Sequence, residues 1–166
     1  MTKALFFLIF LACSYNIIAQ ENNIPDVTVF NVNGEEINIL DQIDKLTIID
    51  FWATWCKPCI AQMPDLEKIK ASYKGKVEVI SISIDHNYDQ WVSFVSKRKT
   101  NDHHYLIGKN NPLIKFITVS WQDEGFAGSS TSIPVIILVD KNGKIINKNC
   151  PHPASGSFKE LVKQNI

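Results

Sequence analysis

The alternation of hydrophobic and polar positions predicts several strands along the chain. Residues 27–39 alternate with a period of two on both sides of Asn33-Gly34, a dipeptide favoured in tight turns, so they are predicted to form a β-hairpin. Residues 46–52 are apolar at nearly every position, as in a strand that is buried on both faces. Residues 77–84 and 134–139 predict two further strands.

Helical spacing separates these strands. Apolar residues recur every three or four positions over 60–73, and we expect Pro64 to kink this helix without ending it, because the pattern continues beyond it. Further helices are predicted over 88–99 and 158–164. Another helix is predicted over 111–121, because its initial Asn-Pro pair suits an N-cap and a first turn.

The second half of the chain completes the expected architecture. Residues 105–107 predict a short edge strand, and the Gly- and Ser-rich residues 123–132 predict a flexible loop. Asn142-Gly143 predicts a turn into a returning strand over 144–148. This order of elements implies an α/β domain in which a mixed sheet is covered by helices on both faces.

Composition places the chain among ordinary globular proteins. Its 166 residues suit a single domain, and 45% of them are hydrophobic and 20% charged. The formal net charge is +0, so composition gives no reason to expect a nucleic-acid partner or electrostatic attraction to an anionic membrane.

The N-terminal segment is predicted to be an export signal. Lys3 is followed by nine apolar residues, too few to span a membrane, and then by polar residues. We expect cleavage after Ala19, which divides the chain into a signal, 1–19, and a domain, 20–166. Two alternatives attach the protein to a membrane, either by lipidation of Cys13 or as an uncleaved signal anchor. All three predict a periplasmic or otherwise extracytoplasmic location.

The segment Trp55-Cys56-Lys57-Pro58-Cys59 lies between the buried strand and the first predicted helix. Haem attachment would need a histidine directly after the second cysteine, where the chain has Ile60. A structural zinc site would need a second close pair of ligands, and Cys13 and Cys150 are far apart in the sequence. The motif therefore favours a redox-active dithiol, and no metal site is predicted.

The residues around this motif resemble the thioredoxin superfamily. The resemblance rests on Phe51-Trp52-Ala53-Thr54-Trp55-Cys56-Lys57-Pro58-Cys59 and on Ile133-Pro134, about 75 residues further on. The predicted N-terminal hairpin, a helical insertion before Ile133-Pro134 and the export signal are similar to the extracytoplasmic TlpA/ResA-like branch. The resemblance covers 24–164 and implies a thioredoxin-like three-layer fold with an added N-terminal β-hairpin.

The resemblance also implies roles for the two cysteines. Cys56 would be the nucleophile, because the N-terminus of a helix and the neighbouring Lys57 favour its thiolate. Cys59 would be the resolving thiol that attacks the mixed disulfide. The pair would form a redox-active disulfide, and the reaction would need no cofactor.

Asp50 is the acid that we expect to assist these cysteines. A carboxyl group inside a buried strand should have a raised pKa, and the resemblance implies that Asp50 handles the proton of Cys59. Strand alternation would alternatively point Asp50 towards water. ResA-like proteins often carry a glutamate three residues after the second cysteine, where this chain has the non-titrating Gln62. This difference weakens any transfer of the specific partner of ResA.

Three residues are expected to contact substrate. Pro134 resembles the cis-proline of the family, which would expose the backbone of Ile133 for pairing with a substrate strand. Trp55 is expected at the rim of the dithiol, whereas Trp121 is expected in the core or on a helix face.

Cys150 is a possible third thiol. Pairing about the predicted Asn142-Gly143 turn places Cys150 opposite Val135 or Pro134, at the end of the sheet that carries the dithiol. There it could form an alternative disulfide. The competing interpretation is a small buried hydrophobic residue without a redox role.

These observations predict an exported thiol:disulfide oxidoreductase that acts on protein or peptide thiols and disulfides, as a reductase supplied with electrons by a membrane or periplasmic donor. The first alternative is a redox-silent module that binds peptides. The second is a copper-binding module in which a histidine joins Cys56 and Cys59, although related copper chaperones usually separate their cysteines by three residues instead of two.

Overall fold

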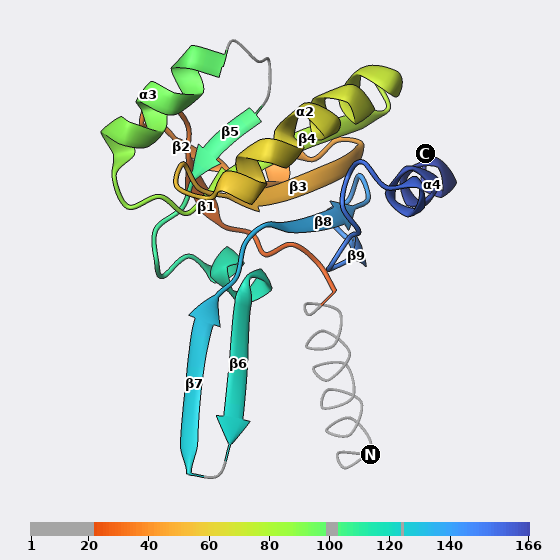
Figure 1. Ribbon diagram of the computed structural model, residues 1–166. Coiled ribbons are helices and arrows are strands. Elements are labelled where there is room, and N and C mark those ends of the chain that lie inside the picture. The colour runs from red at the N-terminus through yellow and green to blue at the C-terminus, as the bar shows by residue number, and fades with distance from the viewer. Residues whose placement is uncertain (1–21, 99–102, 124) are drawn as a thin grey trace, which may run out of the picture.

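The computed structural model describes residues 22–98, 103–123 and 125–166 (Figure 1). The predicted signal over 1–19, with Cys13 and Ala19, lies outside the described residues. No helix in the described part of the chain is long and apolar enough to cross a membrane.

Strand β3, Leu46–Trp52, is the central strand next to the dithiol motif. All seven of its residues are buried, as the nearly continuous apolar pattern predicts. It pairs in parallel with β4, Val77–Ser83, and antiparallel with β8, Val135–Val139. The site is therefore built on the middle of a sheet with partners on both sides.

The main sheet has seven strands in the order β2-β1-β5-β4-β3-β8-β9. The outer strands are β1 (Thr28–Phe30), β2 (Glu36–Asn38), β5 (His103–Leu106) and β9 (Ile145–Asn147). The predicted N-terminal hairpin is confirmed by the antiparallel pairing of β1 with β2. The segment that predicted an edge strand instead forms β5, which lies inside the sheet between β1 and β4.

Helical elements cover both faces of this sheet. In the described part of the chain the α-helices are α2 (Lys57–Ser72), α3 (Tyr88–Arg98) and α4 (Gly156–Gln164), and α2 continues through Pro64. They lie on one face, where the ring of Trp52 is 5.4 Å from that of Phe94 in α3. On the opposite face the ring of Phe51 is 6.4 Å from that of Phe116 in the 3-10 helix η2 (Pro112–Phe116). A second 3-10 helix, η1, spans Leu40–Gln42. The layered, thioredoxin-like α/β fold is thus confirmed.

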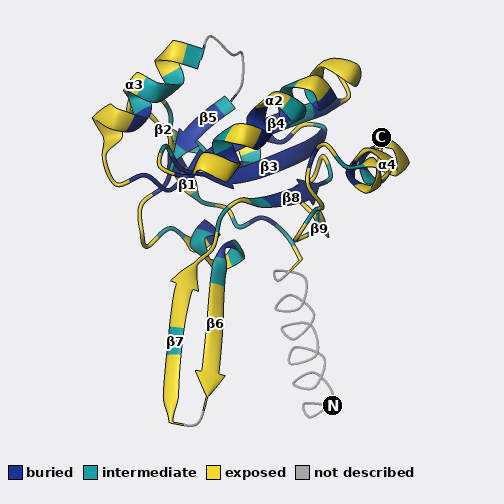
Figure 2. Cartoon of the chain, in the orientation of Figure 1, coloured by how far each residue is buried: buried dark blue, intermediate teal, exposed yellow. Residues whose placement is uncertain are grey.

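The segment after η2 differs from the prediction. Residues 118–131 form a two-stranded antiparallel sheet of β6 (Thr118–Asp123) and β7 (Phe126–Thr131), which extends away from the main sheet (Figure 1). Most of its residues are exposed (Figure 2). The start of the predicted helix over 111–121 is confirmed, because Asn111 caps η2 and Pro112 is its first residue, whereas its continuation to 121 and the predicted loop over 123–132 are wrong.

The physical reason is a change of period within this segment. Apolar residues follow a helical spacing only up to Ile117, and beyond it hydroxyl and amide side chains alternate with Val119 and Trp121. Gly125 forms the turn with a φ of 89°, a conformation that glycine adopts without strain. Trp121 is 51% exposed, so its expected place in the core or on a helix is also wrong.

Candidate active site

The dithiol motif lies where the central strand passes into a helix. Cys56 is the N-cap residue of α2, with an extended backbone, and the backbone N–H of Cys59 donates to Cys56 Sγ at 3.3 Å. First-turn N–H groups have no partner within the helix, so this position stabilises negative charge on Cys56 in the reduced state. Cys56 and Cys59 form a disulfide of 2.00 Å and are both buried.

Asp85 fixes the loop that precedes Cys56. The backbone N–H and the hydroxyl of Thr54 donate to the Asp85 carboxylate at 2.9 and 2.7 Å. The Ser83 hydroxyl donates to the same carboxylate at 2.7 Å. Asp85 is buried two residues after the end of β4, so the segment that follows the neighbouring strand holds the loop in place. Sequence reasoning missed this role, although an acid immediately after an apolar strand is a detectable signal.

Asp50 lies in β3 and is completely buried. Gln62 Nε2 donates to Asp50 Oδ1 at 3.0 Å, whereas Oδ2 has no hydrogen-bond partner among the described residues. Burial raises the pKa of Asp50 from 3.8 to about 7, and the hydrogen bond from Gln62 partly opposes this rise. The alternative in which Asp50 faces water does not apply, and the carboxyl group titrates near neutral pH.

Gln62 shares the buried stripe of α2 with Cys59 and Met63. Side chains on a helix tilt towards its N-terminus, so the Gln62 amide and the Asp50 carboxyl lie beneath the turn that carries Cys59. In the sequence, Gln62 was notable only because it replaces a glutamate. Its position three residues after Cys59 indicates that it lies on the same side of the helix, but its contact with Asp50 depends on how α2 packs on β3 and could not be predicted.

The Ile133-Pro134 peptide bond is cis, as the resemblance implied. In the sheet, Val135 pairs with Phe51, so the start of β8 lies at the end of β3 from which the dithiol loop emerges. Ile133 also packs against the hydrophobic cluster that contains Cys56 and Cys59. The structure therefore brings this dipeptide to the dithiol end of the sheet.

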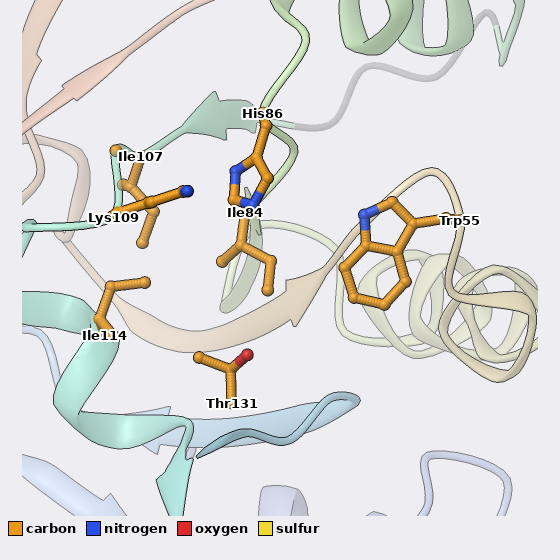
Figure 3. Close-up of a pocket in the computed structure, with 8 residues that line it drawn as sticks. Trp55, Ile84, His86, Ile107, Lys109, Ile114 and Thr131 are labelled. Atoms are coloured by element: carbon orange, nitrogen blue, oxygen red, sulfur yellow. The ribbon is translucent and has the colours of Figure 1, made fainter. Parts of the chain in front are cut away.

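Trp55 forms one wall of a pocket of about 310 Å³ beside the dithiol (Figure 3). Trp55 is 60% exposed. The other lining residues come from the segments after β4 and β5, from η2 and from the end of β7: Ile84, His86, Ile107, Gly108, Lys109, Ile114 and Thr131. Sequence reasoning identified Trp55 but none of these neighbours, because four separate segments converge here only in the folded chain.

Cys150 lies within one residue of its predicted register. Its backbone N–H donates to the carbonyl oxygen of Ile136 at 2.9 Å. The side chain packs against a hydrophobic cluster that includes Leu138 and Phe158, separate from the cluster that contains the dithiol. Burial raises the pKa of its thiol to about 12, so little thiolate is present at neutral pH. This placement favours a packing role, and a redox role for Cys150 stays an untested prediction.

The described residues contain no group of three or more His, Cys, Asp or Glu side chains arranged to hold a metal ion. The arrangement of Cys56, Cys59 and Asp50 supports thiol–disulfide exchange. It combines a nucleophile at a helix N-terminus, a second cysteine one turn later and a buried acid that titrates near neutral pH.

Comparisons with known proteins agree with this geometry. A family model described as thioredoxin-like matches residues 44–145. The thiol-disulfide oxidoreductase ResA of Bacillus thuringiensis subsp. konkukian is 28% identical over 141 residues, which cover 84% of this chain and 75% of ResA. The thioredoxin-like protein YneN of Bacillus subtilis is 35% identical over 66 residues, which cover 40% of this chain and 39% of YneN.

A solved structure extends the match to the fold. The crystal structure of a candidate thiol-disulfide oxidoreductase from Bacteroides vulgatus superposes with a TM-score of 0.70 at 26% identity, and the match covers 87% of this chain and 94% of that one. The chain therefore belongs to the thioredoxin-like family, and within it the chain is similar to thiol-disulfide oxidoreductases.

Proposed function

We propose that the chain is an extracytoplasmic thiol:disulfide oxidoreductase that reduces disulfides of protein or peptide partners. The observation that carries this proposal is the position of Cys56 at the N-cap of α2, the helix whose Gln62 binds a buried acid with a pKa of about 7. Similarity to ResA and the predicted export signal over 1–19 support action outside the cytoplasm, with 20–166 as the mature domain.

The reaction would proceed in two exchange steps. In the reduced protein, the Cys56 thiolate attacks one sulfur of the partner disulfide, which forms a mixed disulfide and releases the first partner thiolate. Asp50 then accepts the proton of Cys59, and the new thiolate attacks Cys56 Sγ. This second step releases the other partner thiolate and leaves the Cys56–Cys59 disulfide, so two electrons pass to the partner.

Residues beside the dithiol would hold the partner during these steps. Trp55 is exposed next to Cys56, and Ile133 and Pro134 lie at the same end of the sheet. We assign these three residues to substrate binding, with the backbone of Ile133 available to an extended partner segment. A membrane or periplasmic donor would then return electrons to the Cys56–Cys59 disulfide.

The first test is the reduction of insulin disulfides with dithiothreitol as the electron source. Cys56→Ser should abolish turnover, because no nucleophile remains to start the exchange. In a separate mixture of insulin with Cys59→Ser that has been reduced and then freed of dithiothreitol, a mixed disulfide with the partner should accumulate and be visible by mass spectrometry, because no second thiol is present to release it.

An inactive unmodified protein, or a Cys56→Ser variant that keeps full turnover, would contradict the proposal. Measurement of the reduction potential of the Cys56–Cys59 couple tests the direction of exchange, since a reductase needs a potential below that of its compartment. Fractionation of expressing cells tests the location.

A further inference from the structure

The pocket beside Trp55 combines an apolar interior with basic groups at its opening. Ile84, Ile107 and Ile114 form apolar walls, and the first two are almost completely buried. Figure 3 shows Trp55 on one side of the cavity and Lys109 with Ile107 and Ile114 on the other. A volume of about 310 Å³ is at the lower end of ligand sites, which suits one large side chain and its neighbour better than a cofactor.

The basic side chains at this opening have no acidic partner among the described residues that line the pocket. His86 and Lys109 are both exposed, and neither forms a hydrogen bond or an ion pair within the part of the chain that the structure describes. The described lining also includes no carboxylate. The ammonium group of Lys109 is therefore available to a negatively charged group of a ligand, which would complement both the charge and the apolar walls.

The pocket shares Trp55 with the dithiol motif. Trp55 directly precedes Cys56, and Thr131 lies three residues before Pro134. One extended residue spans about 3.5 Å, so a partner held at Cys56 places the residues next to its own cysteine at this opening. The occupant is thus expected to be a segment of the disulfide substrate itself.

We propose that this pocket selects partner cysteines that are followed by a large apolar residue and then by an acidic residue. The apolar side chain enters between Trp55 and the isoleucines, and the carboxylate meets Lys109. This inference rests on the proposed function, because it names the substrate class of the same dithiol.

The test compares disulfide-linked peptides that contain Cys-Phe-Glu, Cys-Phe-Lys or Cys-Ser-Glu, with kcat/KM as the readout. The wild-type protein should prefer Cys-Phe-Glu to Cys-Phe-Lys by about fivefold, the effect of one exposed charge pair. It should prefer Cys-Phe-Glu to Cys-Ser-Glu by about tenfold, because the serine peptide leaves the apolar walls unfilled.

Charge reversal provides the decisive comparison. Lys109→Glu should invert the preference between Cys-Phe-Glu and Cys-Phe-Lys. Lys115→Glu is the matched control and should keep the wild-type preference, because Lys115 lies over the Phe116 ring on η2 and does not line the pocket. Equal wild-type rates for the two charged peptides, or the same change in both variants, would overturn the proposal.

A neutral substrate separates this inference from the proposed function. Hydroxyethyl disulfide has neither an aromatic group nor a charge, so its reduction reports the dithiol alone. If this compound is reduced while the charged peptides are not distinguished, the pocket proposal fails and the oxidoreductase function stands. If neither the compound nor any peptide is reduced, both fail.

Discussion

Asp50 and Gln62 form a buried, hydrogen-bonded pair that sets the pKa of the Asp50 carboxyl group. Desolvation favours the neutral acid, and the amide of Gln62 favours the carboxylate by donating to Oδ1. The balance leaves the carboxyl group able both to accept and to release a proton near neutral pH. A proton acceptor of this kind suits the step in which Cys59 must become a thiolate.

The pKa of Asp50 predicts how stability depends on pH. In the folded protein it is about 7, against an ordinary value of 3.8, so the folded state binds more protons than the unfolded state between these values and loses stability as the pH rises. Asp50→Asn removes this titration. Its free energy of unfolding relative to wild type should therefore increase by about 3 kcal/mol from pH 5 to pH 8.

Urea unfolding of the oxidised proteins at the two pH values checks this expectation. The oxidised form is used because the burial and the pKa of Asp50 refer to the structure that contains the Cys56–Cys59 disulfide. If the difference in the free energy of unfolding between the two proteins is the same at both pH values, the pKa of Asp50 is not raised in the folded protein.

Gln62→Leu should raise the pKa of Asp50 further. The substitution removes the hydrogen bond that favours the carboxylate, so a rise of about one pH unit is expected, which carbon-13 NMR of the Asp50 carboxyl group would measure. Met63→Leu is the matched control, because Met63 is the next buried residue of α2 but does not bond to Asp50. An unchanged Asp50 titration in Gln62→Leu, or an equal shift in the control, would refute the role of Gln62.

At the scale of residues, the sequence was most informative where the chemistry is local. Cys56 and Cys59 could be identified because their spacing, the preceding strand and the following helix all lie within 46–73. Burial of Asp50 followed from the same apolar run. By contrast, Gln62 and Asp85 act through hydrogen bonds between different elements, and no local pattern specifies those contacts.

At the scale of elements, the β6–β7 hairpin shows what periodicity misses. Residues 111–117 have helical spacing, whereas the residues after Ile117 alternate as in a strand. The predicted helix was wrong beyond this point because it continued the first pattern into the second. The polar loop prediction failed for a related reason, because serine and glycine also occur in exposed strands. A Cβ at Gly128 would lie 2.6 Å from the Trp121 ring, so a larger residue at this position would require the exposed indole to move.

The exposure of this hairpin predicts that it contributes little to global stability. Replacing 119–130 with an Asn-Gly turn should change the free energy of unfolding by less than about 1 kcal/mol, because shortening a surface loop has a small entropic effect. Its strands pair only with each other. Ile137→Ala, at a completely buried position of β8, should instead cost about 3 kcal/mol.

Chemical denaturation of both variants makes this comparison, and insulin reduction shows whether the shortened protein keeps its dithiol chemistry. A loss of stability in the shortened protein as large as that of Ile137→Ala would mean that the hairpin supports the main fold.

At the scale of the whole molecule, the architecture could be predicted because its units are common. Strands separated by helices imply parallel neighbours, and β3, β4 and β5 follow this rule. The face that each helix covers and the internal place of β5 depend on the complete set of tertiary contacts. The same holds for the pocket beside Trp55, which four separate segments create.

The pocket and the dithiol are built from different parts of the fold. The dithiol and Asp50 belong to the central strand and its helix, whereas His86 and Lys109 lie in connecting segments at the surface. Surface connections accept substitutions more readily than a buried strand does. Under the proposed specificity, substitutions in these connections would change the preferred partner without altering the dithiol and Asp50.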